Sequence, residues 1–162
     1  MTPRTAVALD QHRQKPGPAF QGLKQAVRPL DRADPPAALR ALREQINANA
    51  ETYRTGRLTV VLYALTAPHG DPTDHLGLAR QFADHKHATV HAEFSDRTGD
   101  VDPALRPGWA KTLRALAHNQ ANAIVSISRT AISHHPTPHR EQLAWLGDHH
   151  AALYLLRPET AL

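Results

Sequence analysis

The sequence contains no cysteine, and this absence removes several kinds of chemistry. Disulfide bonds, thiolate nucleophiles and sulfur-ligated metals are excluded, which fits a reducing compartment. Long apolar stretches are missing too, because no run approaches the roughly 18 residues that span a bilayer. The first residues, MTPRTAVALDQHRQKPGP, lack the hydrophobic segment of a signal peptide. We therefore expect a cytoplasmic protein with no membrane partner.

Glycine is scarce where a nucleotide-binding loop would need it. The segment ALTAPHGDP (64–72) has one glycine, whereas the dinucleotide fingerprint requires three at fixed spacing. No Rossmann-type site and no other cofactor is predicted. What is present is a chain of 162 residues with 41% hydrophobic content, long enough for one domain with a substantial core.

Positive charge is concentrated in the N-terminal third. Residues 1–56 hold 9 Lys or Arg against 5 Asp or Glu, whereas residues 57–162 hold 10 of each, so the net charge of +4 lies in the first part. Residues 1–35 are rich in proline and poor in large apolar groups, a composition that indicates a flexible basic arm. Such an arm can contact the phosphates of DNA, or its charges can serve only to keep it solvated.

Residues 36–56 are predicted to form an amphipathic helix. The sequence DPP at 34–36 is typical of a helix start. Leu39, Leu42 and Ile46 recur near helical spacing and define one apolar stripe. This stripe needs something to pack on, which could be the rest of the chain, a second copy of it, or another protein.

From residue 57 onward, segments typical of strands alternate with segments typical of helices. LTVVLYAL (58–65) is almost continuously apolar, as expected for a strand covered on both faces of a parallel sheet. The other predicted strands are 88–94, 122–128 and 151–156, with a loop at 95–105 and helices at 71–86, 106–120 and 137–149. The alternating pattern of 88–94 is typical of an edge strand. Right-handed connections predict a doubly wound α/β fold with a mostly parallel four-stranded sheet over 57–162.

A doubly wound sheet binds ligands beside the carboxyl ends of its strands, where the winding reverses. If the first and third strands are neighbours, loops 65–71 and 129–136 face each other there. Arg129 would then be a cation at the rim of this crevice. The alternative is an ordinary surface arginine that caps the strand end or pairs with Asp71 or Asp74.

The segment 57–156 resembles the catalytic domain of the serine recombinases of the resolvase and invertase family. Its first strand ends in YALTA (63–67) where that family has YARVS, and its second strand ends in FSD (94–96) before a loop. The next helix opens with RPGW (106–109), as in the family, and the third strand leads into SRTAI (128–132) in place of DRLSR. The resemblance implies a resolvase-like domain with flavodoxin-like winding that acts on DNA.

The same resemblance implies that most catalytic positions have been replaced. In the family, a serine attacks a DNA phosphodiester while a cluster of arginines stabilises the charge on phosphorus. Ala67 stands at the position of the serine, and Ser128 stands at that of an aspartate. Leu65 and Ile132 stand at the positions of two of the arginines. Arg106 and Arg129 are retained, and they are the candidates for binding phosphate or DNA.

Thr66 and Ser128 are the hydroxyl groups that could still attack phosphorus. A shift of one residue along a strand turns a side chain to the opposite face, and a hydroxyl needs a base or several cations to activate it. We therefore expect a divergent recombinase-like domain that associates with DNA without strand transfer. The alternatives are an active phosphoryl transferase using Thr66 or Ser128, and a non-enzymatic interaction module using the stripe Leu39, Leu42 and Ile46.

Twelve histidines raise the question of a metal site. The densest group is His134, His135, His139, His149 and His150. Pro136 and Pro138 lie between His135 and His139 and are expected to prevent the helical geometry that would align these two rings. No cysteine or paired glutamate completes a ligand set, so no metal is predicted.

Overall fold

The computed structural model describes residues 35–161, so the basic arm predicted over 1–35 lies outside the described residues except for its last position. The described chain runs through α2 (Pro35–Tyr53), β1 (Thr59–Leu65), α3 (Thr73–His85), β2 (Thr89–Asp96), η1 (Pro103–Leu105), α4 (Pro107–Ala117), β3 (Ala123–Ser126), η2 (Arg129–Ala131), α5 (Pro136–Asp148) and β4 (Ala152–Leu155). The predicted alternation of strands and helices is confirmed. The segment predicted as a loop contains the end of β2 and the short helix η1.

The four strands form one parallel sheet in the order β2-β1-β3-β4. β1 pairs with both β2 and β3, so the winding reverses between β1 and β3. The predicted doubly wound α/β class is therefore confirmed. β2 lies at one edge of the sheet, as its alternating pattern indicated, and β4 lies at the other.

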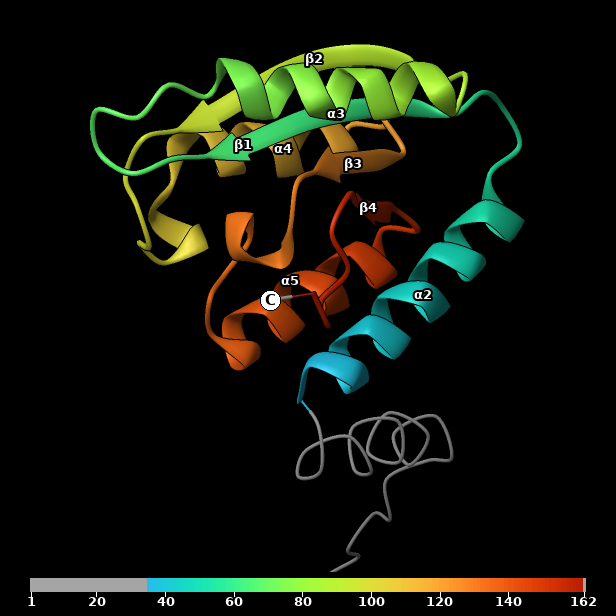
Figure 1. Ribbon diagram of the computed structural model, residues 1–162. Helices are drawn as coiled ribbons and strands as arrows, with labels where there is room; N and C mark the ends of the chain where they lie inside the picture. Colours follow the sequence, from blue (N-terminus) through green and yellow to red (C-terminus); the bar gives the residue numbers. More distant parts are fainter. Residues whose placement is uncertain (1–34, 162) are drawn as a thin grey trace, which may run out of the picture.

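Successive side chains of β1 face two different parts of the core. Val61 and Tyr63 belong to the cluster formed with α4 and α5, whereas Val60 and Leu62 belong to the cluster formed with α3. Figure 1 shows α3 and α4 on opposite sides of the strands. Because both faces are covered, nearly every residue of this strand is apolar.

α2 packs into the core of the α/β domain. Leu39 is 1% exposed and Ile46 is 8% exposed, and both share a cluster with Leu143 and Leu146 of α5. Leu42 is partly buried against the same cluster. The alternative in which this stripe mediates self-association or docks a partner is therefore wrong, because the chain itself covers these side chains.

α2 also covers the open edge of β4 (Figure 1). The Asn47 carboxamide donates from Nδ2 to the Leu153 carbonyl oxygen at 2.8 Å and accepts from the Leu153 amide at 2.8 Å. One side chain thus satisfies the two backbone groups that a neighbouring strand would otherwise pair. Uncovered strand edges are templates for aggregation, so this contact protects the sheet.

A buried ion pair joins α2 to the segment after β4. Arg43 Nε and Nη2 donate to the two carboxylate oxygens of Glu159 at 2.7 and 3.1 Å, and Glu159 is 3% exposed. Burial alone would raise the pKa of Glu159, but the interactions with His139 and Arg43 outweigh it and lower the pKa to about 2. His139 Nε2 lies 3.7 Å from the nearer oxygen, beyond hydrogen-bond distance, so the bidentate contact with Arg43 is the firmer cause.

α5 begins earlier than the sequence indicated. Both Pro136 and Pro138 lie in its first turn, where backbone amides have no helical partner and proline is tolerated. The amide of His139 donates to the carbonyl oxygen of His135 at 3.2 Å. The expectation that the two prolines prevent helical geometry at this point is therefore wrong.

Two histidines and an asparagine lie directly after helices, in the conformation that ends them. His87, Asn119 and His150 have φ angles of 54°, 56° and 52°, in the left-handed region that terminates a helix.

Among residues 35–161, no three His, Asp or Glu side chains gather where they could hold a metal ion. Over the same range, none of the helices combines the length and apolar character needed to cross a bilayer.

Candidate functional site

A cavity of about 390 Å³ lies at the carboxyl edge of the sheet, where β1 and β3 end. The end of β1 and its loop contribute Ala64, Leu65, Thr66 and Ala67, and the end of β3 and its loop contribute Ser126, Ile127, Ser128, Thr130 and Ala131. The predicted meeting of the two loops across a crevice is confirmed, because β1 and β3 are neighbours.

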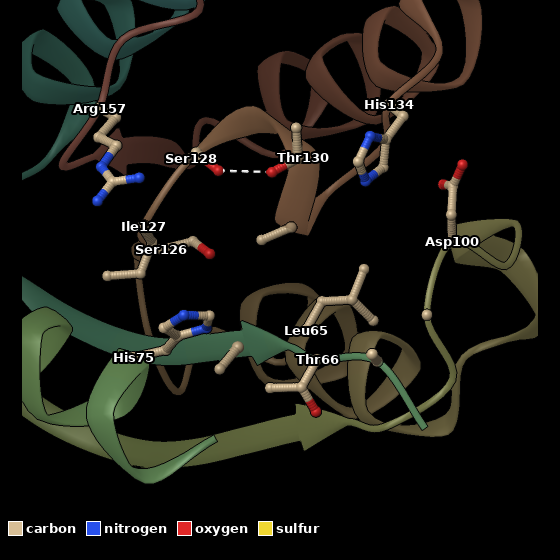
Figure 2. Close-up of a pocket in the computed structure, with 14 residues that line it drawn as sticks. Leu65, Thr66, His75, Asp100, Ser126, Ile127, Ser128, Thr130, His134 and Arg157 are labelled. Atoms are coloured by element: carbon tan, nitrogen blue, oxygen red, sulfur yellow. Dashed lines mark hydrogen bonds between the residues drawn. The ribbon is translucent and has the colours of Figure 1, made fainter. Parts of the chain in front are cut away.

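Four more polar residues line the cavity, and two of them, His75 and Arg157, come from segments that the sequence did not single out. The four are His75 in α3, Asp100 in the loop after β2, His134 before α5 and Arg157 after β4. Figure 2 shows Arg157 and Asp100 on opposite sides of the cavity. Arg157 could have been found by the rule that selected Arg129, since it also follows the end of a parallel strand.

The segment that matches the family's nucleophile loop presents apolar groups to the cavity. Figure 2 shows the side chain of Leu65 directed into it, while the hydroxyl of Thr66 points away. Thr66 Oγ1 is buried and has no hydrogen-bond partner among residues 35–161. The turn closes tightly over it, because a Cβ added at Gly70 would lie 2.8 Å from Thr66 Cβ. Thr66 is therefore poorly placed to attack a ligand in the cavity.

The hydroxyl groups beyond β3 are already engaged with their neighbours. Ser128 Oγ and Thr130 Oγ1 lie 2.7 Å apart and share a hydrogen bond (Figure 2). Ser126 Oγ is fully buried and donates to the carbonyl oxygen of Tyr63 at 2.8 Å. Ile132 is 0% exposed and belongs to the core. No base in hydrogen-bond contact with Ser128 is present within the described part of the chain.

Arg106 is a buried brace. It is 1% exposed; its Nη1 donates to the carbonyl oxygens of Ala131 and Ile132 at 2.8 and 2.9 Å, and its Nε donates to that of Val101 at 2.7 Å. The guanidinium does not line the cavity. In this position it holds the loop after β3 against the segment before α4, and its Nη2 is buried without a hydrogen-bond partner among residues 35–161.

The RPGW motif has a physical basis in the contacts of Asp96 at the end of β2. The Asp96 carboxylate accepts from the amides of Gly108 and Trp109 at 2.8 and 2.9 Å and from the Tyr63 hydroxyl at 2.9 Å. Burial raises the pKa of Tyr63, and the bond to Asp96 raises it further, so the phenol remains a donor. A Cβ at Gly108 would lie 2.6 Å from the Ser95 carbonyl oxygen, which explains the glycine.

Arg129 is the first residue of η2 and is partly buried. Its Nη2 lies 3.5 Å from the carbonyl oxygen of His134, at the limit of a hydrogen bond, and its Nη1 is buried without a partner in the range 35–161. Within that range it pairs with neither Asp71 nor Asp74; Asp71 accepts from the Thr73 amide instead. Arg129 is not among the cavity-lining residues, and its contact with DNA remains a prediction.

These features define an open, doubly wound parallel α/β domain with its cavity at the reversal of winding. Two solved structures share this fold with it. The N-terminal catalytic domain of TP901-1 integrase aligns with a TM-score of 0.55 and 10% identity, over 60% of this chain and 76% of that one. The C-terminal catalytic domain of ISC1926 TnpA, an IS607-like serine recombinase, aligns with a TM-score of 0.54 and 13% identity, over 64% of this chain and 73% of that one.

The fold is that of a serine recombinase catalytic domain, as the motifs indicated. No protein-family model matches the sequence, and no curated protein matches it.

Proposed function

We propose that this recombinase-like domain associates with DNA and does not catalyse strand transfer. The observation that supports the second part is the wall of the cavity, where Leu65 points inward and Ala67 lies nearby. The family resemblance matches these two residues to an arginine and to the nucleophilic serine. Phosphoryl transfer depends on cations aimed at the developing charge. Because Arg106 is committed to backbone carbonyls, the remaining cationic groups do not reproduce such a cluster.

Association with DNA is supported by the placement of positive charge and by the two structural neighbours, whose names describe an integrase and a serine recombinase. Six lysines and arginines lie in residues 1–34 against three acidic residues. If all six contact phosphates, the logarithm of the binding constant should fall with the logarithm of salt concentration with a slope of about −5. This binding depends on charge and requires no particular base sequence.

The binding test uses the full chain and fluorescent duplex DNA over a series of salt concentrations. Neutralising the arm (Arg4, Arg13, Lys15, Lys24, Arg28 and Arg32, each changed to Gln) should weaken binding and flatten the slope. Lys111→Gln with Arg114→Gln, on the exposed side of α4, is the control and should change little. Absence of binding, or binding that ignores salt, contradicts association with DNA.

The catalytic test incubates the wild-type chain with supercoiled plasmid. We expect neither nicked circles nor a covalent protein–DNA adduct. Ala67→Ser should also remain inactive, because it restores a hydroxyl without restoring the cations that activate it. An adduct formed by the wild type and lost on Thr66→Ala or Ser128→Ala would establish the transferase alternative.

A further inference from the structure

The cavity is lined by hydrogen-bond donors that are not paired with any other described residue. The guanidinium of Arg157 and the imidazoles of His75 and His134 line it from three separate elements. Within residues 35–161, none of these three side chains forms a hydrogen bond or an ion pair. Guanidinium and imidazole groups are donors suited to phosphate oxygens, and an imidazole donates even when neutral.

The remainder of the cavity has the size of a small-molecule site. About 390 Å³ falls within the range of ligand pockets, and its lining is about equally polar and apolar, which suits a polar small molecule. Here Ala64, Leu65 and Ile127 provide apolar surface, and the bonded pair Ser128 and Thr130 provides hydroxyl oxygens. A sugar-sized ligand fits such a lining better than a bare ion does.

Asp100 distinguishes a compact ligand from a polyanion. It lies on the opposite side of the cavity from Arg157 (Figure 2), and its ion-pair contact is with the exposed ring of His135 at 3.7 Å. A phosphodiester chain crossing the cavity would pass this carboxylate and be repelled by it. A ligand with a phosphate at one end and hydroxyl donors at the other would satisfy both sides.

We propose that the cavity binds a small hydroxyl-bearing phosphomonoester, with its phosphate at Arg157 and its hydroxyl groups toward Asp100. The site is formed by residues of the α/β domain and does not depend on association with DNA. No bond is made or broken in it.

The test is calorimetric titration of the full chain with ribose 5-phosphate, inorganic phosphate and ribose. Ribose 5-phosphate should bind at least about tenfold more tightly than inorganic phosphate, since its hydroxyl groups add hydrogen bonds to the Asp100 carboxylate. Ribose alone should give no signal. Arg157→Gln should weaken ribose 5-phosphate binding at least about tenfold, whereas Arg114→Gln, an exposed arginine outside the cavity, should not.

Asp100→Ala separates the two ends of the site. It should weaken binding of ribose 5-phosphate and leave that of inorganic phosphate unchanged or stronger. No binding of ribose 5-phosphate at millimolar concentration overturns the proposal, as does an equal loss in Arg157→Gln and Arg114→Gln. Equal affinity for ribose 5-phosphate and inorganic phosphate overturns the role of Asp100. Thermal midpoints of all variants confirm folding, and the DNA titration is scored independently.

Discussion

Arg106 Nη1 and the carbonyl oxygen of Ala131 are joined by a 2.8 Å hydrogen bond across 25 residues of sequence. The bond fixes the loop that carries Thr130 into the cavity against the start of α4. A residue that the family resemblance assigns to phosphate therefore maintains the wall of the site from behind it.

Loss of this brace should destabilise the domain. Arg106→Met is expected to lower the free energy of unfolding by roughly 3 kcal/mol, because the buried carbonyls of Ala131 and Ile132 lose their donor. Urea unfolding measures the change. Lys111→Met on the exposed side of α4 is the control, and its effect should stay within about 0.5 kcal/mol. Equal stability of Arg106→Met and wild type contradicts the bracing role.

Gly108 should tolerate no side chain. In Gly108→Ala the new Cβ meets the Ser95 carbonyl oxygen at 2.6 Å and the Asp96 carboxylate at 2.8 Å, so α4 must move away from β2. We expect a loss of about 2 kcal/mol or more, as for other overpacked backbone contacts. Thermal unfolding of Gly108→Ala beside Gly77→Ala, whose added Cβ has no neighbour within 4 Å, provides the comparison. A Gly108→Ala protein at least as stable as Gly77→Ala would show that the contact relaxes freely.

Asn47→Leu should expose the edge of β4. Two hydrogen bonds to Leu153 are removed, which is expected to cost about 2 kcal/mol, and the uncovered strand should promote concentration-dependent association. Urea unfolding and light scattering after size exclusion measure the two effects. Asn49→Leu, at an exposed position of the same helix, controls for the added apolar group. If both variants associate to a similar extent, exposure of the β4 edge is not the cause.

Glu159 should make stability depend on acid pH. Its pKa is lowered from 4.5 to about 2 in the folded chain, so its contribution is complete above pH 4.5 and disappears as the pH falls toward 2. A shift of this size corresponds to about 3 kcal/mol. Urea unfolding should show a large difference between wild type and Glu159→Gln at pH 7 that shrinks below pH 4.5. Glu141→Gln, an exposed control, should show no such trend. If the stability difference between wild type and Glu159→Gln does not change with pH, ionisation of Glu159 is not the cause of the acid sensitivity.

The sequence was most informative where one physical rule determined the outcome. The apolar run 58–65 predicted a doubly covered strand, and its neighbours predicted a parallel sheet whose order places two loops together. The expectation that Pro136 and Pro138 prevent helical geometry between His135 and His139 is wrong, because the first turn of α5 accommodates both prolines.

The site was predicted less completely because side-chain direction is a tertiary property. Arg106 and Arg129 follow strands or open helices as expected, yet neither lines the cavity. Asp100 and His75 reach it only through the spatial arrangement of a loop and a helix that have no motif of their own. The stripe of α2 was ambiguous for the same reason, since periodicity shows that a face is buried and not what buries it.

The contact between Asn47 and Leu153 joins positions 106 residues apart, close to the two ends of the described chain. α2 is among the first described segments to be synthesised, yet its packing surface is built from α5 and β4, which are synthesised last. Until then its apolar stripe has only non-native surfaces to meet. Closing so long a loop is slow, since folding rates fall as contacts become more distant in sequence. Docking of α2 is therefore expected late in folding. Before it docks, the exposed stripe makes the nascent chain most prone to misassembly.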